Sequence, residues 1–230
     1  RKRICRSLAM LRNKQLEKIS GSIAGHLPKI GKIHADGGLN ASTPEKQEAM
    51  TEVLIAALVP KEWQVRFVDE NIRPVAESEF AWADAVLVSG MHIQRRQILD
   101  LARRAHRAGK VIALGGPSVS AAPEYYPDID LLHCGEVGDG TLDLFRRLDE
   151  TAARPEQQIL YRTVDRLSMT EFPTPAYHLI DVRQYLLGSV QYSSGCPFTC
   201  EFCDIPALYG RNPRLKSPQQ ILLELDELAD

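Results

Sequence analysis

From about residue 45 onward, hydrophobic and polar positions follow two alternating patterns, one typical of strands and one typical of helices. Four mostly apolar runs begin near residues 65, 84, 110 and 130, and their continuity is typical of strands buried on both faces of a parallel sheet. Between them, apolar residues recur at helical spacing, most clearly over 93–108, where Ile98 and Leu101 share one side. This alternation predicts βαβ units with right-handed crossovers. We expect an α/β fold with a Rossmann-like, doubly wound parallel sheet over 45–150.

The carboxyl ends of these strands form the expected ligand-binding edge, because ligands of such sheets bind beyond them. Three of the four strand ends carry glycine, which lets the backbone approach a ligand closely. No G-x-G-x-x-G follows any expected strand, which disfavours a dinucleotide-binding site. The residues expected at this edge are Ser89, Gly90, Met91, His92, Gly115, Gly116, Pro117, Ser118, Gly135 and Glu136.

The remaining segments show weaker patterns. Residues 1–44 contain no convincing buried strand, so we expect a basic, poorly defined N-terminal segment. Residues 151–188 are interrupted by prolines and predict a connector that packs between domains. Residues 189–194 predict a short strand, and a helix is expected to begin at Ser217 and Pro218. Residues 189–230 would then form a single βα unit.

Composition and charge place the chain among ordinary globular proteins. It has 44% hydrophobic residues, a formal net charge of -2, no apolar run near the ~20 residues that cross a bilayer, and no secretory signal pattern. We expect a cytoplasmic protein without a membrane span. Nine Lys and Arg fall within 1–33 against one acid, Glu17. Since that segment has no aromatic side chain to stack on bases, we interpret it as a solvated leader and expect no nucleic-acid partner.

Three of the five cysteines fall within eight residues. Cys196, Cys200 and Cys203 have the spacing C-x3-C-x2-C, and thiolates suit zinc or iron–sulfur clusters. An odd number of cysteines without a secretion signal disfavours a disulfide framework. Three thiolates can hold three irons of a cubane cluster and leave the fourth open to a substrate. The alternative is a non-catalytic zinc site with a fourth ligand elsewhere, such as His178 or Cys134.

This loop resembles the signature of the radical S-adenosylmethionine (SAM) superfamily. Besides the cysteine spacing, it shares the glycine before the first cysteine, the aromatic Phe202 before the third, the preceding strand and the following helix. The resemblance implies a 4Fe-4S cluster on Cys196, Cys200 and Cys203 that binds SAM and cleaves it to a 5′-deoxyadenosyl radical. It also implies that the main chain at Phe202 helps to seat the adenine.

A Rossmann-like domain before such a loop resembles the cobalamin-binding radical SAM proteins. Residues 191–215, with CDIP at 203–206 and YGRNPR at 209–214, are similar to a subgroup of hopanoid-type methylases and uncharacterised members. The resemblance implies that cobalamin binds at the ten strand-end residues named above. It further implies methylation of an unactivated carbon in a small-molecule or lipid substrate, with an external electron donor.

The sequence departs from this class in two places. It lacks a clear Asp-x-His-x-x-Gly motif, because Lys32 occupies the aspartate position before His34, and we interpret this fragment as a coincidence. It also lacks the further βα units of a radical SAM barrel, so we expect 1–230 to be inactive alone, either a fragment or part of a complex. Non-methylating radical chemistry (ring contraction, cyclisation or methylthiolation) shares every motif present and stays open.

Overall fold

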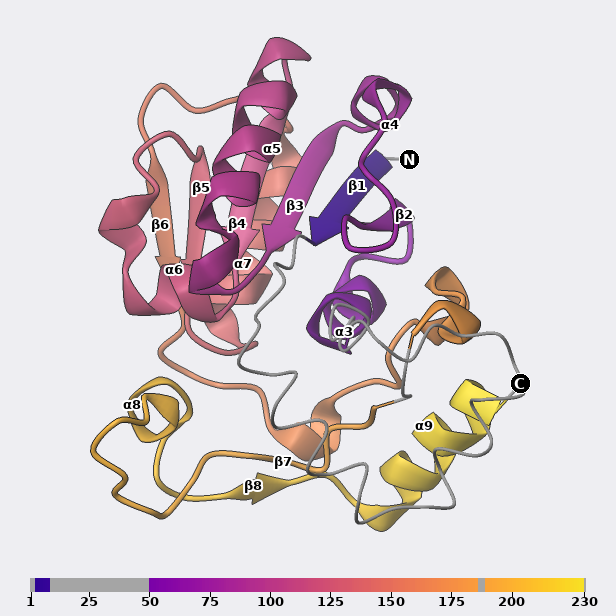
Figure 1. The fold of residues 1–230 in the computed structure, drawn as a ribbon, viewed down its shortest axis with the longest axis vertical. Helices are drawn as coiled ribbons and strands as arrows, with labels where there is room; N and C mark the ends of the chain where they lie inside the picture. The colour runs from indigo at the N-terminus through magenta and orange to yellow at the C-terminus, as the bar shows by residue number, and fades with distance from the viewer. Residues whose placement is uncertain (1–2, 9–49, 186–188, 230) are drawn as a thin grey trace.

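Six parallel strands form the central sheet in the computed structural model, which describes residues 3–8, 50–185 and 189–229. Their order in the sheet is β2-β1-β3-β4-β5-β6 (Figure 1). The strands are β1 (Arg3–Leu8), β2 (Gln64–Asp69), β3 (Ala85–Ser89), β4 (Val111–Gly115), β5 (Leu131–Cys134) and β6 (Ile159–Arg162). The four predicted strands are therefore confirmed as β2 to β5.

The sheet also takes in two strands that lie outside the predicted range 45–150. Strand β6 forms one edge within the predicted connector. Strand β1 lies between β2 and β3, with Ile4 level with Val65 on one side and with Ala85 on the other. The expectation that 1–44 supplies no strand of the sheet is wrong. The order 2-1-3-4-5 of the first five strands reverses between β1 and β3, which is a topological switch point.

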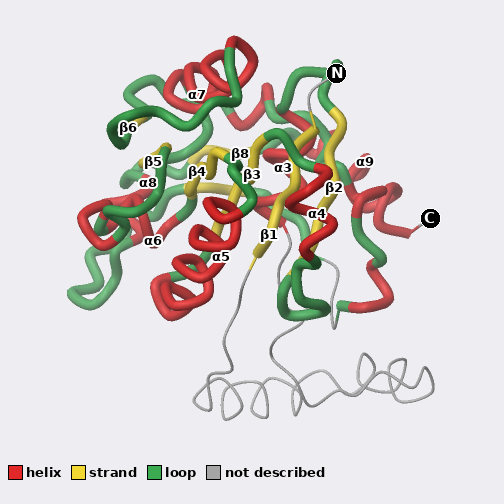
Figure 2. The backbone as a smooth tube through the Cα atoms, turned by 90° about the horizontal axis from the view of Figure 1, so that it is seen from above, coloured by secondary structure: helices red, strands yellow, loops and turns green. Residues whose placement is uncertain are grey.

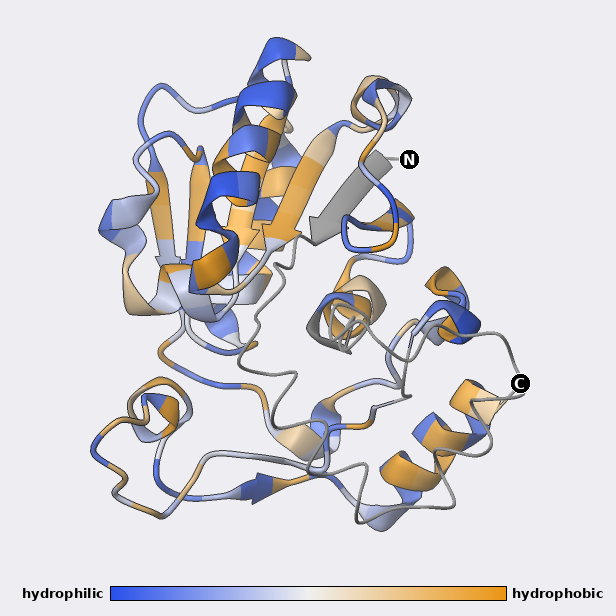
Figure 3. Cartoon of the chain, viewed as in Figure 1, coloured by the Kyte–Doolittle hydropathy of each residue, from blue (hydrophilic) through white to orange (hydrophobic). Residues whose placement is uncertain are grey.

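Helices cover both faces of the sheet, as a doubly wound fold requires (Figure 2). One face packs on α4 (Glu77–Trp82), α5 (Arg95–Arg107) and α6 (Pro117–Ala121), where Phe80, Ile98 and Leu101 are buried in the core. The other face packs on α3 (Met50–Leu58) and α7 (Asp139–Glu150). Figure 3 shows β3, β4 and β5 as mainly hydrophobic between these two helical layers. The amphipathic helix predicted over 93–108 is confirmed as α5.

The C-terminal segment lies below the carboxyl ends of the strands in Figure 1. It contains β7 (Ser193–Ser194), α8 (Ile205–Tyr209), β8 (Arg214–Leu215) and α9 (Pro218–Ala229). The helix predicted at Pro218 is confirmed. The expectation that one strand leads through the loop to one helix is wrong, because α8 and β8 intervene and β7 pairs with β8 in antiparallel fashion.

The predicted connector packs against both the sheet domain and the C-terminal segment. The backbone N–H of Ala176 donates to the carbonyl of Val53 in α3 at 3.0 Å. The side-chain amide of Gln220 in α9 donates to the carbonyls of Met169 and Phe172, each at 3.0 Å. The connector also contains 3-10 turns at Met169–Glu171, Tyr177–Leu179 and Val182–Gln184; two more, His92–Gln94 and Pro123–Tyr125, belong to the sheet domain.

Two expectations concern residues that the structure does not describe. The fragment around Lys32 and His34 lies outside the described residues, as does most of the basic segment 1–33. Among the helices that are described, none is both long enough and apolar enough to cross a membrane.

Candidate functional site

A cavity of about 740 Å³ opens at the carboxyl ends of β3, β4 and β5. This volume lies within the range of small-molecule and cofactor sites. The chain's own α8 contributes Ile205, Leu208 and Tyr209 to its lining, so the C-terminal segment and the sheet enclose it together. All ten residues predicted at the ligand-binding edge line this cavity: Ser89, Gly90, Met91, His92, Gly115, Gly116, Pro117, Ser118, Gly135 and Glu136.

Two glycines in the cavity wall lie where a Cβ would meet a neighbouring side chain. Gly116 has a φ of 96°, and a Cβ there would come within 2.6 Å of Ser89 Oγ. A Cβ on Gly90 would come within 2.7 Å of Gln94 Oε1. Because real Cβ atoms do not approach other atoms so closely, a larger residue would shift the side chains of Ser89 and Gln94. The glycines thus leave room for these two side chains at the cavity floor.

The hydroxyl and imidazole groups after β3 and β4 are joined in one chain of hydrogen bonds. His92 Nδ1 lies 3.2 Å from Ser118 Oγ, which also bonds to the buried Tyr126 hydroxyl. The ring of His92 also lies against that of Tyr125, with 5.2 Å between the centroids. His92 is exposed at the cavity mouth and has a protein partner.

His133 on β5 is a second histidine of the cavity, and the sequence patterns did not single it out. It is 6% exposed, and burial lowers its pKa to about 4. Its Nε2 lies 3.0 Å from both Thr141 Oγ1 and Thr163 Oγ1. The one signal in the sequence is a histidine inside an otherwise apolar strand, where a neutral, hydrogen-bonded imidazole is the form that burial permits.

The carboxylate of Glu136 connects the cavity rim to the C-terminal segment. It accepts hydrogen bonds from Ser194 Oγ and the Arg214 guanidinium, and Arg166 Nε lies 3.1 Å from it. Arg166 also donates to the carbonyls of Leu208 and Tyr209 in α8. The side chain of Glu136 is only 10% exposed. Glu136 lines the cavity as predicted, while its charge is paired with protein groups that set the position of β7, β8 and α8.

The cysteine loop runs from Gly195 to the start of α8. Its described contacts are mainly backbone hydrogen bonds, including Cys196 N–H to the Gly210 carbonyl at 3.0 Å and Cys203 N–H to the Cys200 carbonyl at 3.2 Å. Gly195 has a φ of 93°, and a Cβ there would come within 2.8 Å of the Asn212 carbonyl oxygen. The backbone of the loop is therefore fastened at its start by the turn before β8.

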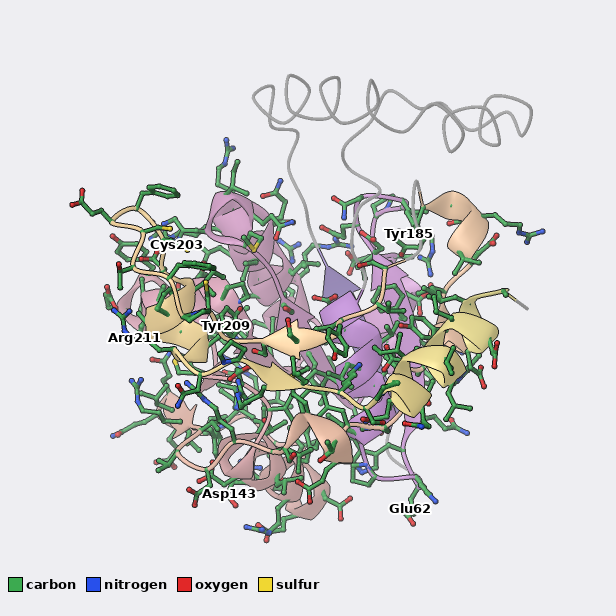
Figure 4. All side chains as sticks on the ribbon, turned by 90° about the horizontal axis from the view of Figure 1, so that it is seen from below. Glu62, Asp143, Tyr185, Cys203, Tyr209 and Arg211 are labelled. Atoms are coloured by element: carbon green, nitrogen blue, oxygen red, sulfur yellow. The ribbon has the colours of Figure 1, made fainter. Side chains whose placement is uncertain are left out.

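The three predicted cluster ligands carry free thiols. Cys200 is exposed, and Cys196 and Cys203 are partly exposed. Neighbouring Phe202 is 91% exposed. Within the described residues, no three or more His, Cys, Asp or Glu side chains converge on a point where they could hold a metal ion. Figure 4 shows Cys203 and Tyr209 on one side of the molecule and Tyr185 on the other.

The loop nevertheless reaches the cavity at its C-terminal end. Asp204, which directly follows Cys203, lines the cavity together with Ile205. Neither the cysteines nor Phe202 are part of the lining. Three free soft donors on one exposed loop fit an iron–sulfur cluster as a donor set. The cavity and the loop are thus adjacent, with the cysteines outside the cavity wall.

The alternative fourth ligands for zinc lie in different settings. Cys134 is buried on β5, where its thiol donates to the Val119 carbonyl at 3.2 Å and burial raises its pKa. His178 is exposed in the connector. The acidic end of β2 is also separate from the cavity: Asp69 is buried, accepts a hydrogen bond from the Tyr185 hydroxyl at 3.1 Å, and has a pKa raised by burial.

Comparison with known proteins adds a chemical class. The chain is 61% identical over 178 residues to a hopanoid C-2 methylase of Rhodopseudomonas palustris, a match that covers 77% of this chain and 34% of the relative. Its relatives are methyltransferases. An uncharacterised methyltransferase of Synechocystis is 41% identical over 180 residues, covering 77% of this chain and 33% of the relative.

A more distant relative acts on a different molecule. The bacteriochlorophyllide d C-12(1)-methyltransferase of Chlorobaculum tepidum is 25% identical over 182 residues, covering 76% of this chain and 38% of the relative. The chain spans about a third of the length of these curated relatives. No family model matches the chain.

Proposed function

We propose that this chain is the cobalamin-binding and cluster-binding part of a radical SAM methylase that methylates an unactivated carbon. When bound, the cluster with SAM and the cobalamin would supply the radical and the methyl group. The observation that supports this proposal most strongly is the cavity. All ten strand-end residues line one space of about 740 Å³ that the C-terminal segment helps to enclose. A cofactor held there would lie next to the loop that carries the cysteines.

The chain's own residues would have three tasks in this function. The glycine-bearing loops after β3 and β4 would hold the cobalamin by close backbone approach. Cys196, Cys200 and Cys203 would hold the cluster, with the Phe202 main chain beside the adenine of SAM. Glu136, through Arg166 and Arg214, would keep the cysteine segment in position over the cavity.

Closing the loop around a cluster requires movement of its side chains. The three thiols do not converge in the described structure. Exposed or partly exposed cysteines next to exposed Phe198 and Phe202 have few packing contacts to lose. Cluster binding would therefore order side chains and leave the backbone bond between Cys196 and Gly210 in place. Coupling of metal binding to local folding is common when ligands are not preformed.

We further propose a hopanoid as the substrate of the whole protein, with ring carbon C-2 as the methylated position. The support is the 61% identity to the hopanoid C-2 methylase, against 25% to the bacteriochlorophyllide methyltransferase. A chimera tests this: the matching 178 residues of the Rhodopseudomonas enzyme are replaced by those of this chain. Restored 2-methylhopanoid in a strain lacking the native gene is expected, and cobalamin and cluster content equal to wild type without that product would contradict the substrate.

Anaerobic iron–sulfur reconstitution of the chain tests the cluster. We expect a brown protein with charge-transfer absorption and about four irons and four sulfides per chain. Cys200→Ala should lose the absorption and the bound iron and sulfide, because two thiolates cannot hold the cubane. The matched control is Cys134→Ser, which changes a buried thiol and keeps a donor to the Val119 carbonyl. A colourless protein with stoichiometric zinc, or equal iron in the Cys200→Ala variant, would contradict the proposal.

A further inference from the structure

The hydrogen bonds around His133 fix which of its ring nitrogens carries the proton. The hydroxyl of Thr163 donates its single proton to the Glu136 carbonyl at 2.7 Å. In its contact with His133 Nε2 at 3.0 Å, Thr163 can therefore only accept. Thr141 Oγ1, also 3.0 Å from Nε2, can donate or accept and therefore does not decide the tautomer. A proton on Nε2 is the arrangement in which Nε2 and Thr163 Oγ1 do not face each other as two acceptors. Since a neutral imidazole has one N–H, Nδ1 has a free lone pair.

That lone pair has no partner among the described residues, and it is reachable. The fully buried polar side-chain atoms without a partner in the described structure are Gln94 Nε2, Gln97 Oε1 and Glu224 Oε2. His133 Nδ1 is not one of them, although the residue is 94% buried, so this atom keeps access to the cavity that His133 lines. Gly115 leaves the approach open, because a Cβ there would lie 3.9 Å from Nδ1.

His133 cannot bind an anion through a positive charge on its ring. Burial holds the pKa of His133 at about 4, so the ring is neutral near pH 7 although Asp139 opposes the shift. A neutral ring cannot bind a phosphate or carboxylate as a cation would. What Nδ1 offers is a hydrogen-bond acceptor at a fixed place, and its natural complement is an N–H or O–H group.

We propose that His133 Nδ1 accepts a hydrogen bond from a neutral N–H group of the bound cofactor, namely one of the primary amides at the rim of the corrin ring. This inference rests on the proposed cobalamin site. It gives His133 a positioning and selective role: cofactors with a carboxylate at this place are disfavoured, because two acceptors would face each other without a proton. His133 acts as an acceptor in the outer contacts of the cofactor and leaves cobalt without a ligand from this side chain.

Two substitutions test the roles of the two ring nitrogens of His133 separately. In His133→Gln, the side-chain amide can reach the position of Nε2 and donate to Thr163, while the acceptor at Nδ1 is lost. In His133→Asn, the shorter amide places an oxygen near the position of Nδ1 and gives up the bond to Thr163. His178→Gln, an exposed histidine away from the cavity, is the matched control.

Equilibrium binding of hydroxocobalamin to the purified chain, followed by visible absorption, is the readout. We expect His133→Gln to weaken binding about tenfold, the size of one lost hydrogen bond, while His133→Asn stays within about threefold of wild type. Thermal unfolding should rank the two variants in the opposite order, with His133→Asn the less stable. Binding by His133→Gln equal to that of wild type would overturn the inference.

Two other outcomes are distinguishable. Absence of hydroxocobalamin binding by wild type would refute the cobalamin site itself, and with it the proposed function. Cobalt ligation is tested by electron paramagnetic resonance of the Co(II) form in protein labelled with ¹⁵N-histidine. If histidine is a cobalt ligand, each cobalt line is split into a triplet by ¹⁴N and into a doublet by ¹⁵N. Loss of this nitrogen splitting in His133→Gln would overturn the acceptor role.

Discussion

The cavity floor and the cysteine loop differ in how their shape is maintained. The floor is built from loops whose glycines pack at contact distance and whose hydroxyl and imidazole groups are already joined, as in the chain from His92 through Ser118 to Tyr126. The cysteine loop has a fastened backbone but exposed side chains. The first region is preorganised by the fold, whereas the second takes its side-chain arrangement from whatever its thiols bind.

Two phenylalanines give the largest expected contrast between the regions. Phe80 of α4 is 0% exposed in the core, and Phe202 is 91% exposed beside the cysteines. Phe80→Ala should lower the free energy of unfolding by about 3–5 kcal/mol, because it leaves a cavity among well-packed neighbours. Phe202→Ala should change it by less than about 0.5 kcal/mol. Urea unfolding of the two variants checks this, and a large loss from Phe202→Ala would mean that the loop is packed in solution.

The pH dependence of stability should report His133. Its pKa is about 4 in the folded chain and about 6.5 when unfolded, so the unfolded state binds more protons between these values. Stability is therefore fully present above pH 6.5 and falls as the pH drops toward 4, by up to about 3 kcal/mol. His133→Gln should remove most of this slope in urea titrations between pH 4 and 7. An unchanged slope would assign the effect to other groups.

The smallest expected effect concerns the junction between the two regions. Glu136→Gln keeps the shape of the side chain but removes the charge that Arg166 and Arg214 share, which should cost about 1–2 kcal/mol. Hydrogen exchange should rise in 193–215 and stay unchanged in the strands of the sheet. Asp143→Asn, which breaks an exposed pair with Arg146, is the control and should have almost no effect. Equal exchange in both variants would show that Glu136 does not position the segment.

The strands that were easiest to predict from the sequence are those that are buried on both faces. β3 and β4 are buried on both sides almost throughout, so their apolar runs are unbroken. β1 was missed because Arg3 and Arg6 interrupt its apolar pattern. Edge strand β6 was missed because its four residues alternate between half-buried and exposed, which is a weak signal at that length.

The functional site, too, could be predicted only in part from the sequence. The rule that ligands bind beyond the carboxyl ends of strands was enough to bring ten residues together at one cavity. The partners of Glu136 could not be found this way, because Arg166 and Arg214 lie 30 and 78 residues further along the chain, and the motif that contains Arg214 does not indicate its partner. His133 was missed because its role depends on the side chains of Thr141 and Thr163, which only the fold places beside it.

The position of β1 has a consequence for folding during synthesis. This strand leaves the ribosome before both of its neighbours, because Ile4 pairs with Val65 and with Ala85, which are 61 and 81 residues later in the chain. At about 5–20 residues per second, the nascent chain carries β1 without either neighbour for roughly 3–12 s. Pairings so distant in sequence also slow folding of the finished chain, because a long loop must close before the contacts form. Strand β1 is therefore without its partners at the start of synthesis, and this interval is when a chaperone would have most to protect.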